Sequence, residues 1–172
     1  ECAASFIRTF PHYRERAISI ENILHQKTVK QRADESAEKL LRVSNGIQFG
    51  TVCRIEFRHK GLDRVLRALN KLHEEGYSFD WHVIGEGSDK DAMMSMIKEL
   101  NLERYVHLYG SKANPLPLVK QFDCFLLPSL YEGKPMAVTV AQMLGIPVIA
   151  PRYASAGEQI LSGENGYIME NS

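Results

Sequence analysis

Four basic residues lie at the end of the strand-like run "GTVCRI" or shortly after it: Arg54, Arg58, His59 and Lys60. A helix-like segment follows them directly. Cations beside a helix N-terminus, where backbone N–H groups point outward, are a typical arrangement for binding phosphate. Arg54 and Lys60 stand six positions apart across the predicted loop, so one anion can bridge them. The alternative, a solvated basic loop without a ligand, stays open from these residues alone.

A single carboxylate, Glu132, lies in "PSLYEGKPMAVTVAQMLGIPVIAP" between a strand-like run and a helix that we expect to begin near Pro135. Its plainer role is a favourable charge at that helix N-terminus. Gly133 and Pro135 can make the turn without it. Loops after parallel strands meet at one edge of an open sheet, so Glu132 and the cations are predicted to share a cleft. A phosphate clamp beside a hydroxyl acceptor suits a phosphorylated sugar.

The elements that must position these residues alternate from residue 50 onward. Short runs rich in β-branched and aromatic residues alternate with helix-period segments, which is typical of β-α-β units. Helices are predicted at "KGLDRVLRALNKLHEEG" and at "SDKDAMMSMIKELNL", the second with Ser88 and Asp91 as a capping box. The predicted fold class is α/β, a doubly wound parallel sheet of Rossmann-like type. Its strands are predicted at "GTVCRI", "FDWHVIGEG", "YVHLYG", "FDCFLLP", "IPVIAP" and "GYIM".

The first 45 residues have a different pattern. They combine one strand-like run, "AISIEN", with a charged, helix-compatible stretch that ends at the turn Ser44-Asn45-Gly46. A chain of 172 residues with 44% hydrophobic residues is long enough for one substantial core. We therefore predict one domain over residues 46–172, preceded by a lead-in over residues 1–45.

Composition argues against several classes of protein. Lysine plus arginine and aspartate plus glutamate number 21 each, so no polyanion and no nucleic acid is predicted as a partner. The three cysteines form no C-x-x-C pair, which favours a reducing, cytoplasmic compartment. No apolar run approaches the roughly 18 residues of a transmembrane segment. The six histidines show no metal-ligand spacing, and no nucleophile elbow or P-loop is present.

The loop "GEGSD" invites a dinucleotide-binding interpretation, which fails. The third glycine of G-x-G-x-x-G would fall at Lys90, and the first predicted strand carries no such fingerprint. Gly85 and Gly87 are instead predicted to allow a tight turn and the close approach of a ligand.

An ordered set of motifs now carries a resemblance: "VCRIEFRHKG", "IGEGSD", "YVHLYG", "PSLYEGKP", "GIPVIAP" and "EQILSGENGYI". Over roughly residues 46–170 the chain resembles the donor-binding C-terminal domain of GT-B glycosyltransferases in the large retaining family numbered four. The form "YEGKP" with "EQI" is similar to bacterial enzymes that build cell-surface polysaccharides. The resemblance implies transfer of a sugar from a nucleotide-sugar donor to a saccharide or glycolipid acceptor, with retention of configuration and without a metal ion or other cofactor.

The resemblance also implies roles for single residues. Arg54 and Lys60 would hold the diphosphate and stabilise the charge that develops on the leaving phosphate. Glu132 matches the first acid of the family's E-x(7)-E motif and would bind hydroxyls of the transferred sugar. The remaining expected donor contacts are the loop of Gly85 and Gly87, the backbone of Tyr109 and Gly110, and the loop of Gly133, Lys134 and Pro135.

Two positions depart from the family pattern. Cys53 stands where a glycine commonly precedes the arginine, and Val140 replaces the second acid of the motif, the ribose ligand. We expect Val140 to continue an apolar, inward-facing stripe with Met136, Met143 and Leu144. The loss of that acid keeps a non-catalytic nucleotide-binding or interaction module open, and a related epimerase remains a third option.

Enzymes of this fold place their site between two Rossmann-like domains, and one is visible here. We therefore expect an excised donor half that is inactive alone, with residues 1–45 as the tail of an N-terminal acceptor domain and the crossing segment. The resemblance leaves open an attachment of the full enzyme to the inner face of the membrane.

Overall fold

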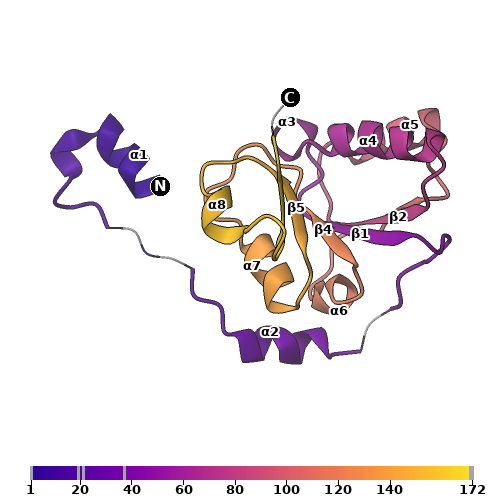
Figure 1. Cartoon of the computed structure of the whole chain (residues 1–172), viewed down its shortest axis with the longest axis horizontal. Coiled ribbons are helices and arrows are strands. Elements are labelled where there is room, and N and C mark those ends of the chain that lie inside the picture. The colour runs from indigo at the N-terminus through magenta and orange to yellow at the C-terminus, as the bar shows by residue number, and fades with distance from the viewer. Residues whose placement is uncertain (1, 19, 21, 37, 171–172) are drawn as a thin grey trace.

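The computed structural model describes residues 2–18, 20, 22–36 and 38–170. At its centre is a six-stranded sheet with the order β3-β2-β1-β4-β5-β6, in which every neighbouring pair is parallel (Figure 1). The order reverses between β1 and β4, so the sheet is doubly wound and the predicted fold class is confirmed. The strands are β1 (Ile47–Val52), β2 (Phe79–Ile84), β3 (Val106–Leu108), β4 (Cys124–Leu126), β5 (Val148–Pro151) and β6 (Gly166–Met169).

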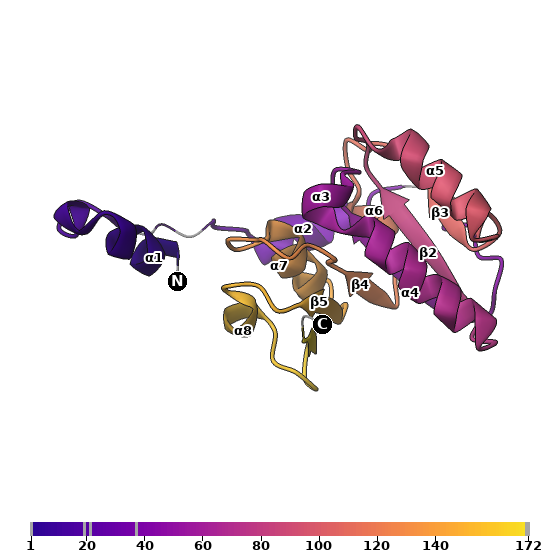
Figure 2. The same ribbon diagram turned by 90° about the horizontal axis from the view of Figure 1, so that it is seen from above.

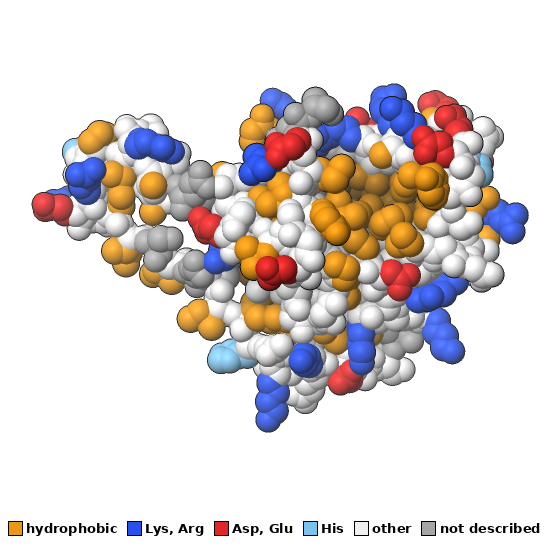
Figure 3. Space-filling view, in the orientation of Figure 1, with side chains coloured by type: hydrophobic (Ala, Val, Ile, Leu, Met, Phe, Trp, Pro, Cys, Tyr) orange, Lys and Arg blue, Asp and Glu red, His pale blue; other side chains and the backbone are white. Residues whose placement is uncertain are grey.

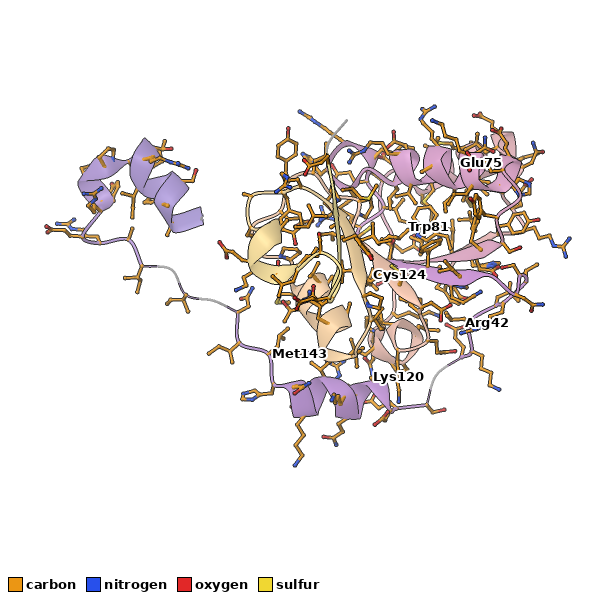
Figure 4. All side chains as sticks on the ribbon, in the orientation of Figure 1. Arg42, Glu75, Trp81, Lys120, Cys124 and Met143 are labelled. Atoms are coloured by element: carbon orange, nitrogen blue, oxygen red, sulfur yellow. The ribbon has the colours of Figure 1, made fainter. Side chains whose placement is uncertain are left out.

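Two helices cover one face of the sheet, above it in Figure 1: α4 (Leu62–Glu74) and α5 (Lys90–Glu99). The predicted apolar spacing of α4 is confirmed, since Leu62, Leu66 and Leu69 are all buried. They belong to one core cluster with Trp81 of β2, which is fully buried and is labelled beneath α4 in Figure 4. This core fixes β1 and β2 and therefore the loops that follow them.

Three helices lie on the opposite face: α2 (Gln26–Ala33), α6 (Leu116–Val119) and α7 (Met136–Met143). A second core cluster gathers there around Phe125 of β4, with Val138 and Ala141 from α7. The buried face of α7 is thus not the predicted stripe, because Met136 is 49% exposed and Val140 is half-buried. The helix turns Val138 and Ala141 inward, three positions apart, and leaves Val140 at the edge.

The beginning of the chain lies apart from the sheet (Figures 1 and 2). It forms α1 (Cys2–Thr9) and the 3₁₀ helix η1 (Pro11–Tyr13). Phe6 contacts Phe10 and Tyr13, with ring centroids 5.2 and 6.1 Å apart. The strand predicted at "AISIEN" is absent from its described residues, and residues 19 and 21 lie outside them. Within the charged stretch before Ser44, residues 26–33 form the helix α2, which packs against the sheet domain.

The capping box predicted for α5 is not formed. The helix begins at Lys90, and the Ser88 hydroxyl donates to Asp89, its neighbour, at 3.2 Å. Asp89 Oδ2 accepts a hydrogen bond from the backbone N–H of Phe57 at 2.7 Å. Phe57 begins the short helix α3 (Phe57–Lys60), so this contact fixes the loop after β1 to the loop after β2.

Apolar side chains gather on the face shown in Figure 3, over the half of the sheet that α4 and α5 do not cover. They line a groove of about 400 Å³ between α4 and β4, β5 and β6. Phe49, Leu126 and Ile149 form its floor, and Val65 and Leu72 of α4 form part of its wall. The helix α8 (Ala156–Gln159) follows β5. No helix of the described residues is long and apolar enough to cross a membrane.

Candidate functional site at the carboxyl edge of the sheet

The predicted site residues come together where the strand order reverses. The loops that follow β1 and β4 leave the sheet side by side, because these two strands are neighbours. In doubly wound sheets this reversal leaves a crevice beyond the carboxyl ends of the strands, where ligands bind. The prediction that these two loops meet at one edge of the sheet is therefore confirmed by the topology.

Lys60 and Glu132 form the centre of the site. Lys60 Nζ donates to Glu132 Oε1 at 2.7 Å, and the two side chains are 28% and 16% exposed. Lys60 is the last residue of α3, where Gly61 adopts the left-handed conformation (φ 61°) that turns the chain into α4. The two groups were predicted to bind separate parts of a ligand, and they lie in direct contact.

Two weakly acidic side chains near this ion pair, Cys53 and Tyr153, have raised pKa values. Burial raises the pKa of the Cys53 thiol to about 11, while nearby Lys60 lowers that pKa and Glu132 raises it. Burial also raises the pKa of Tyr153 to about 12, with a further contribution from Glu132. Cys53 and Tyr153 therefore stay neutral at physiological pH.

Arg54 lines a cleft of about 300 Å³ at the ends of β1 and β2, and neither Lys60 nor Glu132 is among the residues that line it. The side chain of Arg54 is exposed, so it can move toward an anion. None of the other three basic residues of the predicted group lines this cleft. His59 contacts Glu56 at 2.7 Å, and Arg58 is exposed on α3. Of the four predicted residues, the structure places Arg54 at the cleft and Lys60 in the ion pair with Glu132.

Gly85 and Gly87 are required by the packing of two loops. A Cβ atom at Gly85 would lie 1.8 Å from the carbonyl oxygen of Cys53, and one at Gly87 would lie 2.1 Å from that of Ile55. Gly85 also has a φ of 152°. The glycines therefore allow the loop after β2 to lie against the loop after β1, and Gly85 lines the cleft.

Tyr109 and Gly110 directly follow β3, and neither is among the residues that line the cleft. Gly110 has a φ of 68°, and its carbonyl accepts a hydrogen bond from the N–H of Gly85 at 2.8 Å. The next residues, Ser111 and Lys112, line the cleft directly. Neither was predicted, although their place just after a strand of a parallel sheet is a usable signal.

The loop between β4 and α7 holds Glu132 in place. The Ser155 hydroxyl donates to the carbonyl of Gly133, and Arg64 of α4 donates to the carbonyl of Pro128 at 2.8 Å. Gly133 and Lys134 are exposed, and Pro135 is buried directly before α7. The predicted start of this helix near Pro135 is correct.

Val140 borders two cavities. One, of about 190 Å³, is apolar and is also lined by Val52 and Pro115. The other, of about 290 Å³, is also lined by His25 and Thr28 from the N-terminal end of α2. Pro115 is shared by both and by the cleft at Arg54, so the three hollows adjoin. Val140 offers no hydrogen bond to whatever occupies them.

No group of three or more metal-ligating side chains is present among the described residues. The site's charged groups are instead the cations Arg54, Lys60 and Lys112 and the carboxylates Glu86 and Glu132. Such an arrangement can hold an anionic group and accept hydrogen bonds from hydroxyls.

Comparison with known families decides the chain's relationship. Residues 32–172 match the model of the family described as Glycosyl transferases group 1. The chain belongs to this family. The match begins at the end of α2 and includes the whole sheet, so the sheet and its helices from α3 onward are a glycosyl transferases group 1 domain.

Relatives in the glycosyl transferases group 1 family are much longer. An uncharacterized glycosyltransferase of Methanocaldococcus jannaschii is 27% identical over 157 residues, which cover 90% of this chain and 38% of that protein. The lipopolysaccharide 1,6-galactosyltransferase of Escherichia coli is 32% identical over 124 residues, covering 69% of this chain and 34% of the relative. The poly(ribitol-phosphate) alpha-N-acetylglucosaminyltransferase of Staphylococcus aureus is 31% identical over 114 residues, covering 65% and 23%. The chain thus spans about a quarter to two fifths of these relatives.

Solved structures agree with the fold. The lipopolysaccharide outer core galactosyltransferase WaaB in its apo form superposes with a TM-score of 0.68 at 28% identity, covering 73% of this chain and 36% of that chain. A mutant of S. aureus TarM, in complex with Fondaparinux, alpha-GlcNAc-glycerol and UDP, gives 0.69 at 28% identity, covering 80% and 27%. The sheet and its helices therefore have the Rossmann-like architecture of GT-B glycosyltransferases.

Proposed function

We propose that this chain is the donor-binding half of a glycosyltransferase. In this proposal it binds a nucleoside diphosphate sugar at the carboxyl edge of the sheet, and the sugar is transferred with retention to a saccharide or glycolipid acceptor. The observation that carries the proposal is the contact of Lys60 with Glu132 at the reversal of strand order, with Arg54 lining the cleft at the end of β1. It combines cations for a diphosphate with an acceptor for sugar hydroxyls.

Each residue has a chemical role in this proposal. Arg54 and Lys60 neutralise the diphosphate and stabilise the negative charge that the leaving phosphate gains, which a metal ion does in other enzymes. Glu132 accepts hydrogen bonds from hydroxyls of the transferred sugar. In this proposal the wall formed by Ser111 and Lys112 lies beside the nucleoside.

Several finer assignments belong to the proposal as well. They are membership of the retaining family numbered four, a C-terminal position in a two-domain enzyme, and an acceptor site supplied by another domain that residues 1–45 join to this one. Support comes from the share of the relatives that this chain spans. A single sheet domain cannot enclose an acceptor, so we propose that the chain alone transfers no sugar.

Calorimetric titration with UDP, GDP and ADP and their sugar conjugates tests donor binding. We expect the Arg54→Ala variant to bind the preferred nucleotide about tenfold more weakly, since a hydrogen bond to a charged group contributes roughly 1.5 to 3 kcal/mol. Arg67→Ala is the control, because Arg67 is an exposed arginine of α4 outside the cleft. Equal affinity in Arg54→Ala and Arg67→Ala would reject the proposed phosphate clamp.

Val140 favours a second candidate, a non-catalytic nucleotide-binding or interaction module. The side chain borders the hollows next to the cleft and cannot accept a hydrogen bond from a ribose hydroxyl. Activity of the intact protein separates the two: a module binds the nucleotide sugar without consuming it.

A further inference from the structure

Residues 38–44, here called the connecting segment, join the region of α2 to β1 and lie against the sheet at three points. Near its start, Glu38 forms an ion pair with Lys112, on the wall of the cleft. In its middle, the Leu41 N–H donates to the Tyr109 hydroxyl at 2.9 Å. At its end, the Ser44 N–H and hydroxyl donate to Asp80 at 2.9 and 2.8 Å. The first two anchors bind Lys112 and Tyr109, which are the two ends of residues 109–112.

The side of the segment that faces α6 is also fixed. The side-chain oxygen of Gln121 accepts from the Leu40 N–H at 3.1 Å, and its side-chain nitrogen donates to the carbonyl of Glu38. The backbone carbonyl of Gln121 accepts from the Arg42 guanidinium. Figure 4 labels Arg42 on the segment and Lys120 beneath the sheet, both on the side of α2. Lys120 Nζ contacts Asp34 at 2.5 Å, just after α2. The segment is therefore held from both sides along its length.

The hydrogen bonds below the segment have a definite direction. The Gln48 amide nitrogen donates to the carbonyl of Gly46 and to Asp80, so its oxygen must be the acceptor for His82 Nε2 at 2.9 Å. His82 Nδ1 then carries no proton in the neutral ring and accepts from the Tyr109 hydroxyl at 3.2 Å. The lowered pKa of His82, caused chiefly by burial, agrees with a neutral ring. Tyr109 thus uses its hydroxyl both as donor and as acceptor.

The Tyr109 hydroxyl joins the connecting segment to the wall of the cleft. The backbone N–H of Tyr109 donates to the carbonyl of Val83 in β2 at 2.9 Å. The carbonyl of the next residue, Gly110, accepts from the N–H of Gly85 in the loop after β2. The hydroxyl itself does not line the cleft. A change in the connecting segment therefore reaches the cleft through the ring and backbone of Tyr109.

We infer that the connecting segment positions residues 109–112 through the Tyr109 hydroxyl and the Glu38–Lys112 pair, so that Tyr109 is a positioning residue for the nucleoside half of the donor. The inference rests on the proposed function. Because the segment runs from the region of α2 to β1, its anchors also couple the position of α2 to the nucleoside wall.

The test separates the nucleoside wall from the phosphate clamp by using two probes. We expect Tyr109→Phe to lower the affinity for whichever of UDP, GDP and ADP binds most tightly by about fivefold. The affinity for inorganic pyrophosphate should change by less than about twofold. Arg54→Ala is expected to weaken both probes, because the proposed function assigns its guanidinium to the phosphates. Tyr167→Phe is the matched control, since Tyr167 is an exposed tyrosine of β6.

Amide hydrogen exchange gives a readout that needs no ligand. The Gly85 N–H bonds the Gly110 carbonyl, so its exchange is expected to accelerate in Tyr109→Phe and stay unchanged in Tyr167→Phe. Unchanged exchange at Gly85, or equal weakening of nucleotide and pyrophosphate by Tyr109→Phe, overturns the inference. If the unaltered chain binds none of the three nucleotides, the proposed function fails, while accelerated exchange at Gly85 still supports the mechanical link.

Discussion

Lys60 Nζ lies 2.7 Å from Glu132 Oε1 across the loops that follow β1 and β4. Each charge is the other's partner, and the pair is mostly shielded from water. A donor that uses Lys60 for phosphate and Glu132 for sugar hydroxyls must therefore separate them or insert between them. A nucleoside diphosphate without a sugar would compete with Glu132 for Lys60 and would offer Glu132 no hydroxyl from which to accept a hydrogen bond.

The Glu132→Gln substitution is expected to affect nucleotide and nucleotide sugar in opposite ways. A neutral glutamine releases Lys60, so UDP or another nucleoside diphosphate should bind roughly threefold more tightly. The same change weakens the hydrogen bonds that residue 132 accepts from the sugar hydroxyls. The affinity that the sugar adds to that of the nucleoside diphosphate should therefore fall. Calorimetry with both ligands measures this difference, and Glu164→Gln, at an exposed glutamate, is the control. A parallel change for the two ligands would contradict the assignment of Glu132 to the sugar.

Lys60→Ala and Glu132→Gln should be strongly non-additive. Alone, Lys60→Ala leaves Glu132 as an unpaired carboxylate near the phosphates, so nucleotide binding should weaken by more than about tenfold. The double variant removes that repulsion and should recover part of the affinity. A double-mutant cycle measured by calorimetry gives the coupling. The cycle of Arg54→Ala with Glu132→Gln is the comparison and should be closer to additive, and equal coupling in both cycles would count against direct competition for Lys60.

The folded state should lose stability as the pH falls from about 6.5 to about 4. Burial, the main cause, lowers the pKa of His82 to about 4; His107 and Arg42 lower it further, and Asp80 and Asp123 raise it. The unfolded chain takes up a proton near pH 6.5 that the folded chain resists, so the loss amounts to roughly 3 kcal/mol by about pH 4. Urea unfolding across this range measures it.

His82→Gln should flatten this pH dependence, because glutamine does not titrate. His25→Gln, at an exposed histidine, should leave it unchanged. A curve for His82→Gln as steep as that of the unaltered chain would assign the loss to other groups.

Val140→Glu is expected to tighten nucleoside diphosphate binding by roughly tenfold, through one or two regained charge-assisted hydrogen bonds. Val140 is half-buried and borders cavities, so a carboxylate there can keep contact with water. Val138→Glu is the control: Val138 is fully buried, and a charge there should prevent folding. Thermal unfolding with and without nucleotide checks the result. A lower melting temperature for Val140→Glu without tighter binding would show that this position does not reach the ribose.

Much of this protein follows from its sequence alone. Periodicity decides the six strands, the buried stripe of α4 and the doubly wound sheet, because alternating apolar runs of these lengths must be buried on both faces of a parallel sheet. The placement of Arg54 and Glu132 after two strands predicts a common cleft, since the ends of parallel strands meet at one edge. These are local or topological properties that residue types carry by themselves.

Only the tertiary structure decides which groups touch. The contact between Lys60 and Glu132 joins residues 72 positions apart, and the hydroxyl of Tyr109 reaches Leu41 from 68 positions away. The predicted stripe of α7 was wrong for the same reason. Apolar residues on several sides of a helix do not tell which side meets the sheet, and the packing of Val138 and Ala141 against the core around Phe125 leaves Val140 at the edge. Which side of a helix is buried depends on how elements distant in sequence pack together, and the spacing of residues within the helix does not determine that packing.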